Sequence, residues 1–276
     1  MSSFSSPVSP LPKGREAPTS PAIQDLIASF GEAGGQRGVA ALSLRGPVVH
    51  VEVNADRPQP GASVMKILVA AAVYEEAEAG RLDLAESVVR GDLHSTVYPS
   101  ILAAFAADDR LTLRQLCALM LITSDNPAAD VLIDRVGLDR VNITAREFGA
   151  HATTLVVGFR DDQLGSTGRR NVTTAADTIT ILRALASHDR YRPVLDAMRH
   201  NLRNTRIPAR LPDTVPVAHK TGSLTGVVND AGIIYGRHVD LAVAFLTDEE
   251  SDPARTSIEI AETTSALWAA LGEPID

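Results

Sequence analysis

Residues 61–73 read GASVMKILVAAAV, an apolar run in which Ser63 and Lys66 stand three positions apart. The run predicts an apolar helix, and residues at positions i and i+3 share a helix face. Lys66 is therefore expected one turn above Ser63, within reach of its hydroxyl. A serine at the start of a helix also lies near free backbone N–H groups and the positive end of the helix dipole. The pair has the layout of an activated nucleophile beside a base.

Lysine is scarce in this chain, which gives the pair more weight. Of the 26 Lys and Arg side chains only three are lysines, namely Lys13, Lys66 and Lys220. A lysine amine loses its proton readily when it is desolvated, whereas an arginine guanidinium stays charged. Because a Ser-x-x-Lys spacing also arises by chance, the pair alone does not establish catalysis.

The composition of the chain limits the kinds of partner that the protein can bind. A chain of 276 residues with 45% hydrophobic and 22% charged residues is typical of a globular protein. The net charge of −8 and the lack of a basic cluster argue against binding to nucleic acid or to an anionic membrane. The single cysteine, Cys117, excludes multi-cysteine metal sites, and the spacing of His94, His151 and His219 does not suggest zinc. We expect a monomer without metal or cofactor.

The N-terminal segment 1–20 is rich in Ser and Pro and is expected to be a disordered lead-in. It lacks the apolar core of a signal peptide, and no apolar run approaches the ~20 residues of a membrane helix. The sequence as written predicts a cytoplasmic protein, or a secreted or periplasmic one if an export signal has been removed.

Strand patterns stand at both ends of the chain, and helical patterns lie between them. Strands are expected at 38–44, 48–53, 215–220, 231–235 and 241–246. Helices are expected at 21–30, 63–79, 113–123, 126–136, 141–148, 174–186 and 256–271. A long polar loop is expected at 153–171, and no strand pair is expected between residues 80 and 200.

This order predicts an α/β (α+β) fold in which both ends of the chain build one sheet and the middle forms an inserted helical lobe. A single domain is expected over residues 21–276, with a sheet lobe at 21–61 and 205–276 and a helical lobe at 62–204. The cleft between the lobes is the expected place of a functional site.

Two further short motifs follow Ser63 and Lys66. Ser124-Asp125-Asn126 lies in a predicted turn between two apolar helices, and Lys220-Thr221-Gly222-Ser223 lies at the end of a predicted strand. Each motif has a simpler interpretation, a helix N-cap for the first and a strand that ends in a turn for the second. In this order, however, the three motifs form the set S-x-x-K, S-D-N and K-T-G.

With these motifs the chain resembles the class A serine β-lactamases and the related penicillin-recognising serine enzymes, over about residues 21–271. The resemblance implies a β-lactamase/transpeptidase-like fold, with an antiparallel sheet flanked by terminal helices, an inserted all-helical lobe and the active site between them. It implies a hydrolase that acts on C–N bonds in cyclic amides, the reaction by which such enzymes confer antibiotic resistance. Esters are a second class of substrate for a variant of this activity. Its partner would be a carboxylate-bearing small molecule.

The resemblance also implies catalytic roles. Ser63 would attack the carbonyl and form an acyl-enzyme, and Lys66 would take its proton. Ser124 would pass a proton to the leaving nitrogen, while Lys220 supplies positive potential. Asn126 would hold the substrate amide.

The resemblance implies that the strand motif at 220–223 binds the substrate. Thr221 and Ser223 would bind the substrate carboxylate, and Gly222 would let the strand approach closely. The backbone N–H groups of Ser63 and Ser223 would form the oxyanion hole. Tyr98 resembles the aromatic wall of the family's cleft, and the alternative is a tyrosine of a surface loop.

The loop at 155–171 departs from the family's pattern. Class A enzymes carry a glutamate there, followed four residues on by an asparagine, and this pair positions the water that clears the acyl-enzyme. The loop of this chain contains no glutamate. Asp161 or Asp162 is a tentative deacylation base, and the alternative is a solvated acidic pair. Because loss of a general base costs roughly 10²–10⁴ in rate, we expect impaired or altered deacylation.

Several functions therefore stay open beside a β-lactamase that opens β-lactam or related amide or ester bonds through Ser63. A cytoplasmic esterase or amidase acting on a small metabolite is favoured by the lack of a signal peptide. A penicillin-binding protein or β-lactam-binding sensor would acylate without efficient turnover, although the sequence as written shows no anchor or sensor module for either.

Overall fold

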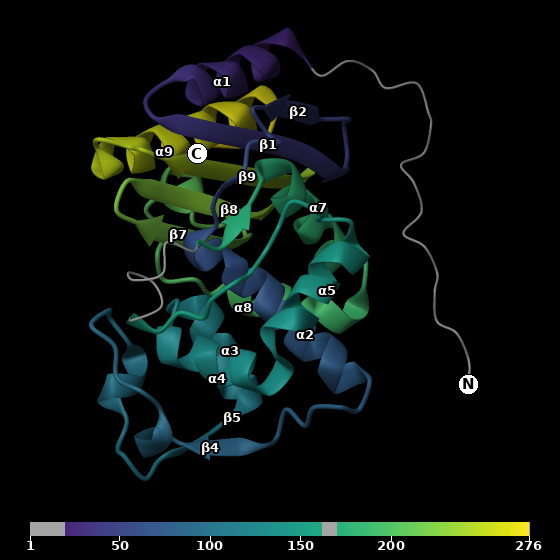
Figure 1. The fold of residues 1–276 in the computed structure, drawn as a ribbon. Coiled ribbons are helices and arrows are strands. Elements are labelled where there is room, and N and C mark those ends of the chain that lie inside the picture. Colours follow the sequence, from purple (N-terminus) through teal and green to yellow (C-terminus); the bar gives the residue numbers. More distant parts are fainter. Residues whose placement is uncertain (1–19, 162–169, 276) are drawn as a thin grey trace.

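The computed structural model describes residues 20–161 and 170–275, and its centre is one antiparallel sheet with helices on both faces (Figure 1). The strand order is β2-β1-β9-β8-β7. The strands are β1 (Gln36–Arg45), β2 (His50–Val53), β7 (Val217–Leu224), β8 (Val227–Tyr235) and β9 (Asp240–Asp248). Strand β1 pairs with β9, so both ends of the chain build one sheet, as the sequence predicts. Each of the five predicted strands is confirmed, although β2 and β7 begin two residues later than predicted, β7 continues to Leu224 and β8 begins already at Val227.

Two terminal helices cover one face of the sheet (Figure 1). These are α1 (Pro21–Glu32) and α9 (Pro253–Ala270), which contact each other. Their apolar faces form a core with the sheet in which Trp268 is fully buried and Phe30 meets Phe245 edge to face at 5.1 Å.

The helical layer covers the other face. It contains α2 (Lys66–Glu78), α3 (Leu113–Ile122), α4 (Asn126–Val136), α5 (Leu138–Phe148), α7 (Ala175–Ala186) and α8 (Arg192–Met198). Helix α2 is the centre of this layer, because every residue from Lys66 to Val73 is buried and α3, α4, α5 and α8 all contact it. A helix that is buried on all sides needs an apolar sequence on all sides, which the run at 61–73 provides.

The structure differs from the sequence-based prediction in two local respects. Ser63 lies in a 3₁₀ turn (Ala62–Met65), and the α-helix begins only at Lys66. The prediction of no strand pair between residues 80 and 200 is wrong, because β4 (Ser87–Val89) pairs with β5 (Arg110–Thr112). A further short pair joins β3 (Gln59–Pro60) to β6 (Val172–Thr173). Strands of two or three residues are too short to show a period in the sequence.

Short 3₁₀ segments complete the described fold, at Arg90–Asp92, Ile101–Ala104, Asp189–Tyr191 and Ile207–Arg210. None of the described helices is long and apolar enough to cross a membrane.

Candidate active site

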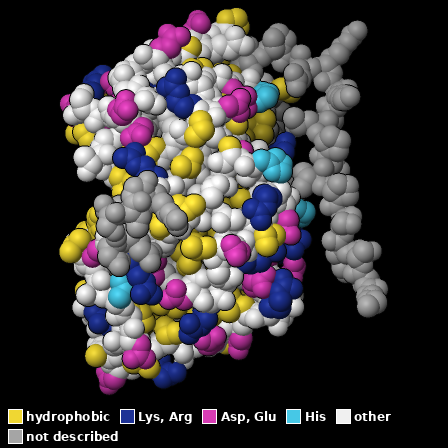
Figure 2. Space-filling view, viewed as in Figure 1, with side chains coloured by type: hydrophobic (Ala, Val, Ile, Leu, Met, Phe, Trp, Pro, Cys, Tyr) yellow, Lys and Arg dark blue, Asp and Glu magenta, His cyan; other side chains and the backbone are white. Residues whose placement is uncertain are grey.

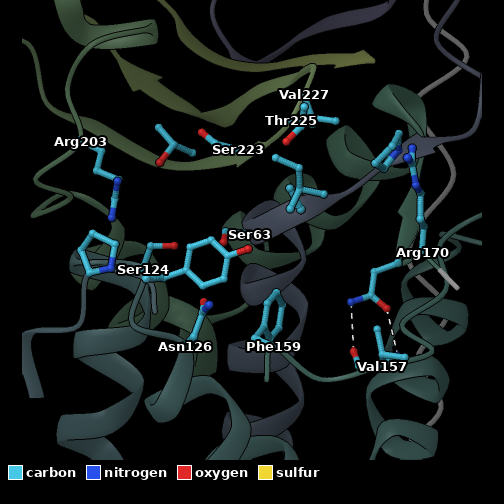
Figure 3. Close-up of a pocket in the computed structure, with 17 residues that line it drawn as sticks. Ser63, Ser124, Asn126, Val157, Phe159, Arg170, Arg203, Ser223, Thr225 and Val227 are labelled. Atoms are coloured by element: carbon cyan, nitrogen blue, oxygen red, sulfur yellow. Dashed lines mark hydrogen bonds between the residues drawn. The ribbon is translucent and has the colours of Figure 1, made fainter. Parts of the chain in front are cut away.

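A cleft of about 570 Å³ lies where β7, the turn that carries Ser63 and the connection between α3 and α4 meet (Figure 3). Six of the side chains predicted from the sequence line it, namely Ser63, Tyr98, Ser124, Asn126, Thr221 and Ser223. Lys66 and Lys220 are buried behind this lining. Residues from all three motifs therefore meet at one site.

Strand β7 passes very close to the turn that carries Ser63. A Cβ atom at Gly222 would lie 3.0 Å from the Cβ of Ala62 and 3.1 Å from the backbone nitrogen of Ser63. Ala62 itself has a φ of +46°, in the left-handed region. The strand can come this close because residue 222 has no side chain. As a result, the backbone segments that carry Ser63 and Ser223 lie next to each other.

The tripeptide at 124–126 both begins helix α4 and lines the cleft. Asp125 is the N-cap of α4, since its carboxylate accepts hydrogen bonds from Ala128 N at 3.0 Å and from Ser100 Oγ at 2.5 Å. Ser124 has a φ of +64°, an uncommon conformation for a residue other than glycine. The cap and the strained residue together turn the side chains of Ser124 and Asn126 to the cleft.

Lys66 is fully buried, and its amine is held by two oxygen atoms. The Nζ atom donates to Ser124 O and to Asn126 Oδ1, both at 2.6 Å, with Ser124 Oγ at 3.4 Å. Burial lowers the pKa of this amine to about 7, against the opposing effect of Asp125 and Asp130. A neutral amine has two N–H groups, so the two short hydrogen bonds leave its lone pair free to accept a proton.

Lys220 is the second buried amine of the site. Its Nζ atom donates to Ser124 Oγ at 2.9 Å and to Thr221 O at 2.8 Å. Burial, with Lys66 nearby, holds the pKa of Lys220 well below its ordinary value. The hydroxyl of Ser124 therefore lies between two amines, of which either can exchange a proton with it.

Arg206 lies behind the strand motif and was not predicted. Its guanidinium donates to Ser223 Oγ at 2.6 Å, to Gly222 O at 2.9 Å and to Asn229 O. Burial lowers the pKa of Arg206, and Asp230 opposes that shift. The chain thus places a positive charge directly against the hydroxyl of Ser223. No motif surrounds this arginine in the sequence, so spacing gave no signal for it.

The loop that follows α5 presents an aromatic ring to the site. The ring centroid of Phe159 lies 4.6 Å from Lys66 Nζ, and the side chain is buried against the cleft. Its backbone N–H donates to Asp130 Oδ1 at 2.6 Å. Burial raises the pKa of Asp130. The only sequence signal for Phe159 is that it is a lone aromatic residue in a polar loop.

Asn171 fixes the base of the same loop. Its Oδ1 accepts from Val156 N at 2.8 Å and from Val157 N at 3.1 Å, and its Nδ2 donates to Val157 O at 3.0 Å. Its own carbonyl accepts from Gly61 N at 2.8 Å. Asn171 thereby ties the loop to the segment that leads into Ser63.

The tentative base Asp161 is placed elsewhere. Its carboxylate accepts from Thr96 Oγ1 and from Val97 N, both at 2.7 Å, and these hydrogen bonds lower its pKa. It is absent from the lining of the cleft, which argues against its role as a base there. Asp162 lies outside the described residues. Tyr98 lines the cleft and is 45% exposed, so it is both a surface-loop residue and part of the wall.

The described side chains offer no cluster of three or more His, Cys, Asp or Glu residues that would hold a metal ion. His219 is buried and bonded on both ring nitrogens, to Asp230 at 2.9 Å and to Asn204 at 3.0 Å. Burial raises the pKa of Cys117 to about 12, which makes it an unreactive thiol.

Comparison with known proteins shows which family the chain resembles. The sequence matches the model described as "Beta-lactamase enzyme family" over residues 18–271. The extended-spectrum β-lactamase PER-1 of Pseudomonas aeruginosa is 26% identical over 263 residues, covering 86% of this chain and 83% of the relative. A β-lactamase of Streptomyces lavendulae is 28% identical over 232 residues, covering 77% and 74%. The solved structure of a β-lactamase from Sphaerobacter thermophilus has a TM-score of 0.81 at 27% identity, covering 91% of this chain and 97% of that one.

Proposed function

The chain belongs to the β-lactamase enzyme family, and from the geometry of its cleft we infer that Ser63 forms an acyl-enzyme that deacylates slowly. Membership of the family makes the protein a serine hydrolase, which confirms the resemblance indicated by the three motifs. The substrates proposed are β-lactams and related amides or esters that bear a carboxylate.

Acylation begins with attack of the Ser63 oxygen on the substrate carbonyl carbon. Neutral Lys66 accepts the serine proton, and a pKa of about 7 keeps much of this amine neutral at physiological pH. Its two short hydrogen bonds to carbonyl oxygens support this role, because they leave the lone pair free. Ser124 then transfers a proton to the leaving atom, a role supported by its place between the two lysines.

In this proposal the substrate is recognised by the wall of the cleft that β7 forms. The hydroxyls of Thr221 and Ser223 bind the substrate carboxylate, with the positive charge of Arg206 against Ser223 and the Lys220 amine, which donates to Thr221 O, beside them. The backbone N–H groups of Ser63 and Ser223 form the oxyanion hole, which the close approach at Gly222 supports. Asn126 holds the substrate amide and Tyr98 flanks it.

The ring of Phe159 over Lys66 is the observation that carries slow deacylation. Hydrolysis of an acyl-enzyme needs a group that takes a proton from the attacking water, and a phenyl ring cannot do so. Asp161 accepts hydrogen bonds from Thr96 and Val97 and is not among the residues that line the cleft. The site is therefore equipped for acylation and lacks, among the described residues, a carboxylate at the acyl group.

The test is intact-mass measurement after incubation with benzylpenicillin. We expect a rise equal to the whole penicillin, because ring opening releases no fragment, and persistence of this adduct after free drug is removed. Ser63→Ala should give no adduct. Rapid return to the unmodified mass would contradict slow deacylation. Absence of an adduct, with turnover of small esters, would instead favour the esterase or amidase.

A further inference from the structure

Two arginines line the cleft at opposite ends, Arg170 and Arg203 (Figure 3). Arg170 is ion-paired with Asp248 at 3.3 Å. Arg203 has no acidic partner among the described residues, and its guanidinium makes only a long contact of 3.5 Å with Thr123 O. No Asp or Glu belongs to the described lining of the cleft. Among the described residues the charge of Arg203 is thus unpaired, and the side chain lines the cleft.

The backbone of Arg203 is fixed to the catalytic strand. Its N–H donates to Asn201 Oδ1 at 2.8 Å, and the buried Asn201 donates from Nδ2 to His219 O at 3.0 Å. His219 precedes Lys220 directly. The coil that carries Arg203 is held again where His219 meets Asn204. The position of this arginine relative to the site is therefore built into the fold, although its side chain reaches solvent.

The location of Arg203 identifies the part of the substrate it meets. Thr123 immediately precedes Ser124, the residue that gives its proton to the leaving atom, so a guanidinium near Thr123 lies on the leaving-group side. The carboxylate next to the leaving atom is already provided for by Thr221 and Ser223. Over the face in Figure 2, acidic and basic side chains are interspersed, so no broad field of one sign dominates there.

We propose that Arg203 selects substrates whose leaving group carries a second anionic group, such as a dicarboxylate. This inference rests on the proposed function, because it requires Ser63 to be acylated. One carboxylate binds at Thr221 and Ser223, and the second pairs with Arg203. A guanidinium suits a carboxylate because it presents parallel N–H donors.

The test compares two thioesters of the same acyl group, benzoyl-D-alanine. One has mercaptoacetate as its leaving group, with one carboxylate, and the other has mercaptosuccinate, with two. In each, the Ser63 oxygen bonds to the acyl carbon, the C–S bond breaks and the serine proton passes to sulfur. Release of the thiol measures acylation, and intact mass shows the common acyl-enzyme.

For the unaltered protein we expect acylation about five- to tenfold faster with the mercaptosuccinate thioester at low salt, and a smaller ratio at high salt because exposed charges are screened. Arg203→Gln should reduce the ratio to about one, whereas Arg203→Lys should retain part of it. The matched control, Arg170→Gln, removes the same charge at the other end of the cleft and should keep the ratio.

Equal rates for the two thioesters in the unaltered protein, with Ser63 acylated by both, would overturn the role of Arg203 and leave the proposed function intact. Equal loss of the ratio in Arg170→Gln and Arg203→Gln would also overturn it, because the effect would then belong to the general potential of the cleft. No acylation by either thioester would remove the proposed function and this inference together.

Discussion

Phe159 is the residue on which the proposal of slow deacylation depends most. Its ring lies against the amine of Lys66 and lines the same cleft as Ser63, so a carboxylate at this position would be close to the amine and would face the cleft. We predict that Phe159→Glu shortens the lifetime of the penicillin adduct by about 10²-fold, the lower end of the range for general-base catalysis. Phe159→Leu is the matched control, since it changes the ring but adds no base. Equal adduct lifetimes in the two variants, measured by intact mass, would refute this explanation.

The amine of Lys66 gives the acylation rate a defined pH dependence. Burial lowers its pKa to about 7, and in the proposed mechanism only the neutral form accepts the Ser63 proton. The rate should therefore rise with pH, about tenfold per unit well below pH 7, and level off above it. Adduct formation followed from pH 5 to 9 measures this profile. Lys66→Gln should lose the rising limb, and a flat profile in the unaltered protein would exclude Lys66 as the base.

At the scale of elements, β7 approaches the turn of Ser63 closely, and the proposed oxyanion hole depends on this approach. A methyl group at Gly222 would have to fit 3.0 Å from Ala62 and 3.1 Å from Ser63 N, so the strand must move by a few tenths of an ångström. Because a displacement of about 1 Å costs about 10²-fold, we expect Gly222→Ala to slow acylation roughly tenfold.

The control for this substitution is Gly80→Ala, far along the chain at the end of α2. A Cβ at Gly80 meets nothing within 4 Å, although its φ of +69° makes the substitution strained. This variant should lose stability but acylate normally. If both variants acylate at the unaltered rate, close approach of β7 is not needed for the reaction.

The elements that could be predicted are those whose signal is local. The five strands of the sheet and the helices that begin at Leu113, Asn126 and Ala175 follow from apolar periodicity and caps, and the three motifs follow from short spacings. Arg203, Arg206 and Phe159 could not be found in this way. Each acquires its place from a contact between segments distant in sequence, as when Arg206 meets Ser223 or Phe159 meets Lys66.

At the scale of the whole molecule, the sheet separates two apolar cores. One lies beneath α1 and α9 and contains Trp268, and the other surrounds α2 and supports the cleft (Figure 1). The residues of the site come from the helical side, from β7 and from the start of β8 at Val227, whereas α9 contributes none of the described cleft lining. Substitutions in the core beneath α9 should therefore lower the stability of the protein without lowering the rate of acylation.

Trp268→Ala tests this separation. Trp268 is fully buried, and removing so large a side chain leaves a cavity that costs about 3–5 kcal/mol of unfolding free energy. Denaturant unfolding should show this loss, while the rate of penicillin adduct formation, measured well below the melting temperature, should stay within about twofold because α9 lies across the sheet from Ser63. Trp268→Phe fills most of the cavity and should recover much of the stability. A large loss of acylation in folded Trp268→Ala would show instead that packing beneath α9 positions β7, and that the two cores act as one.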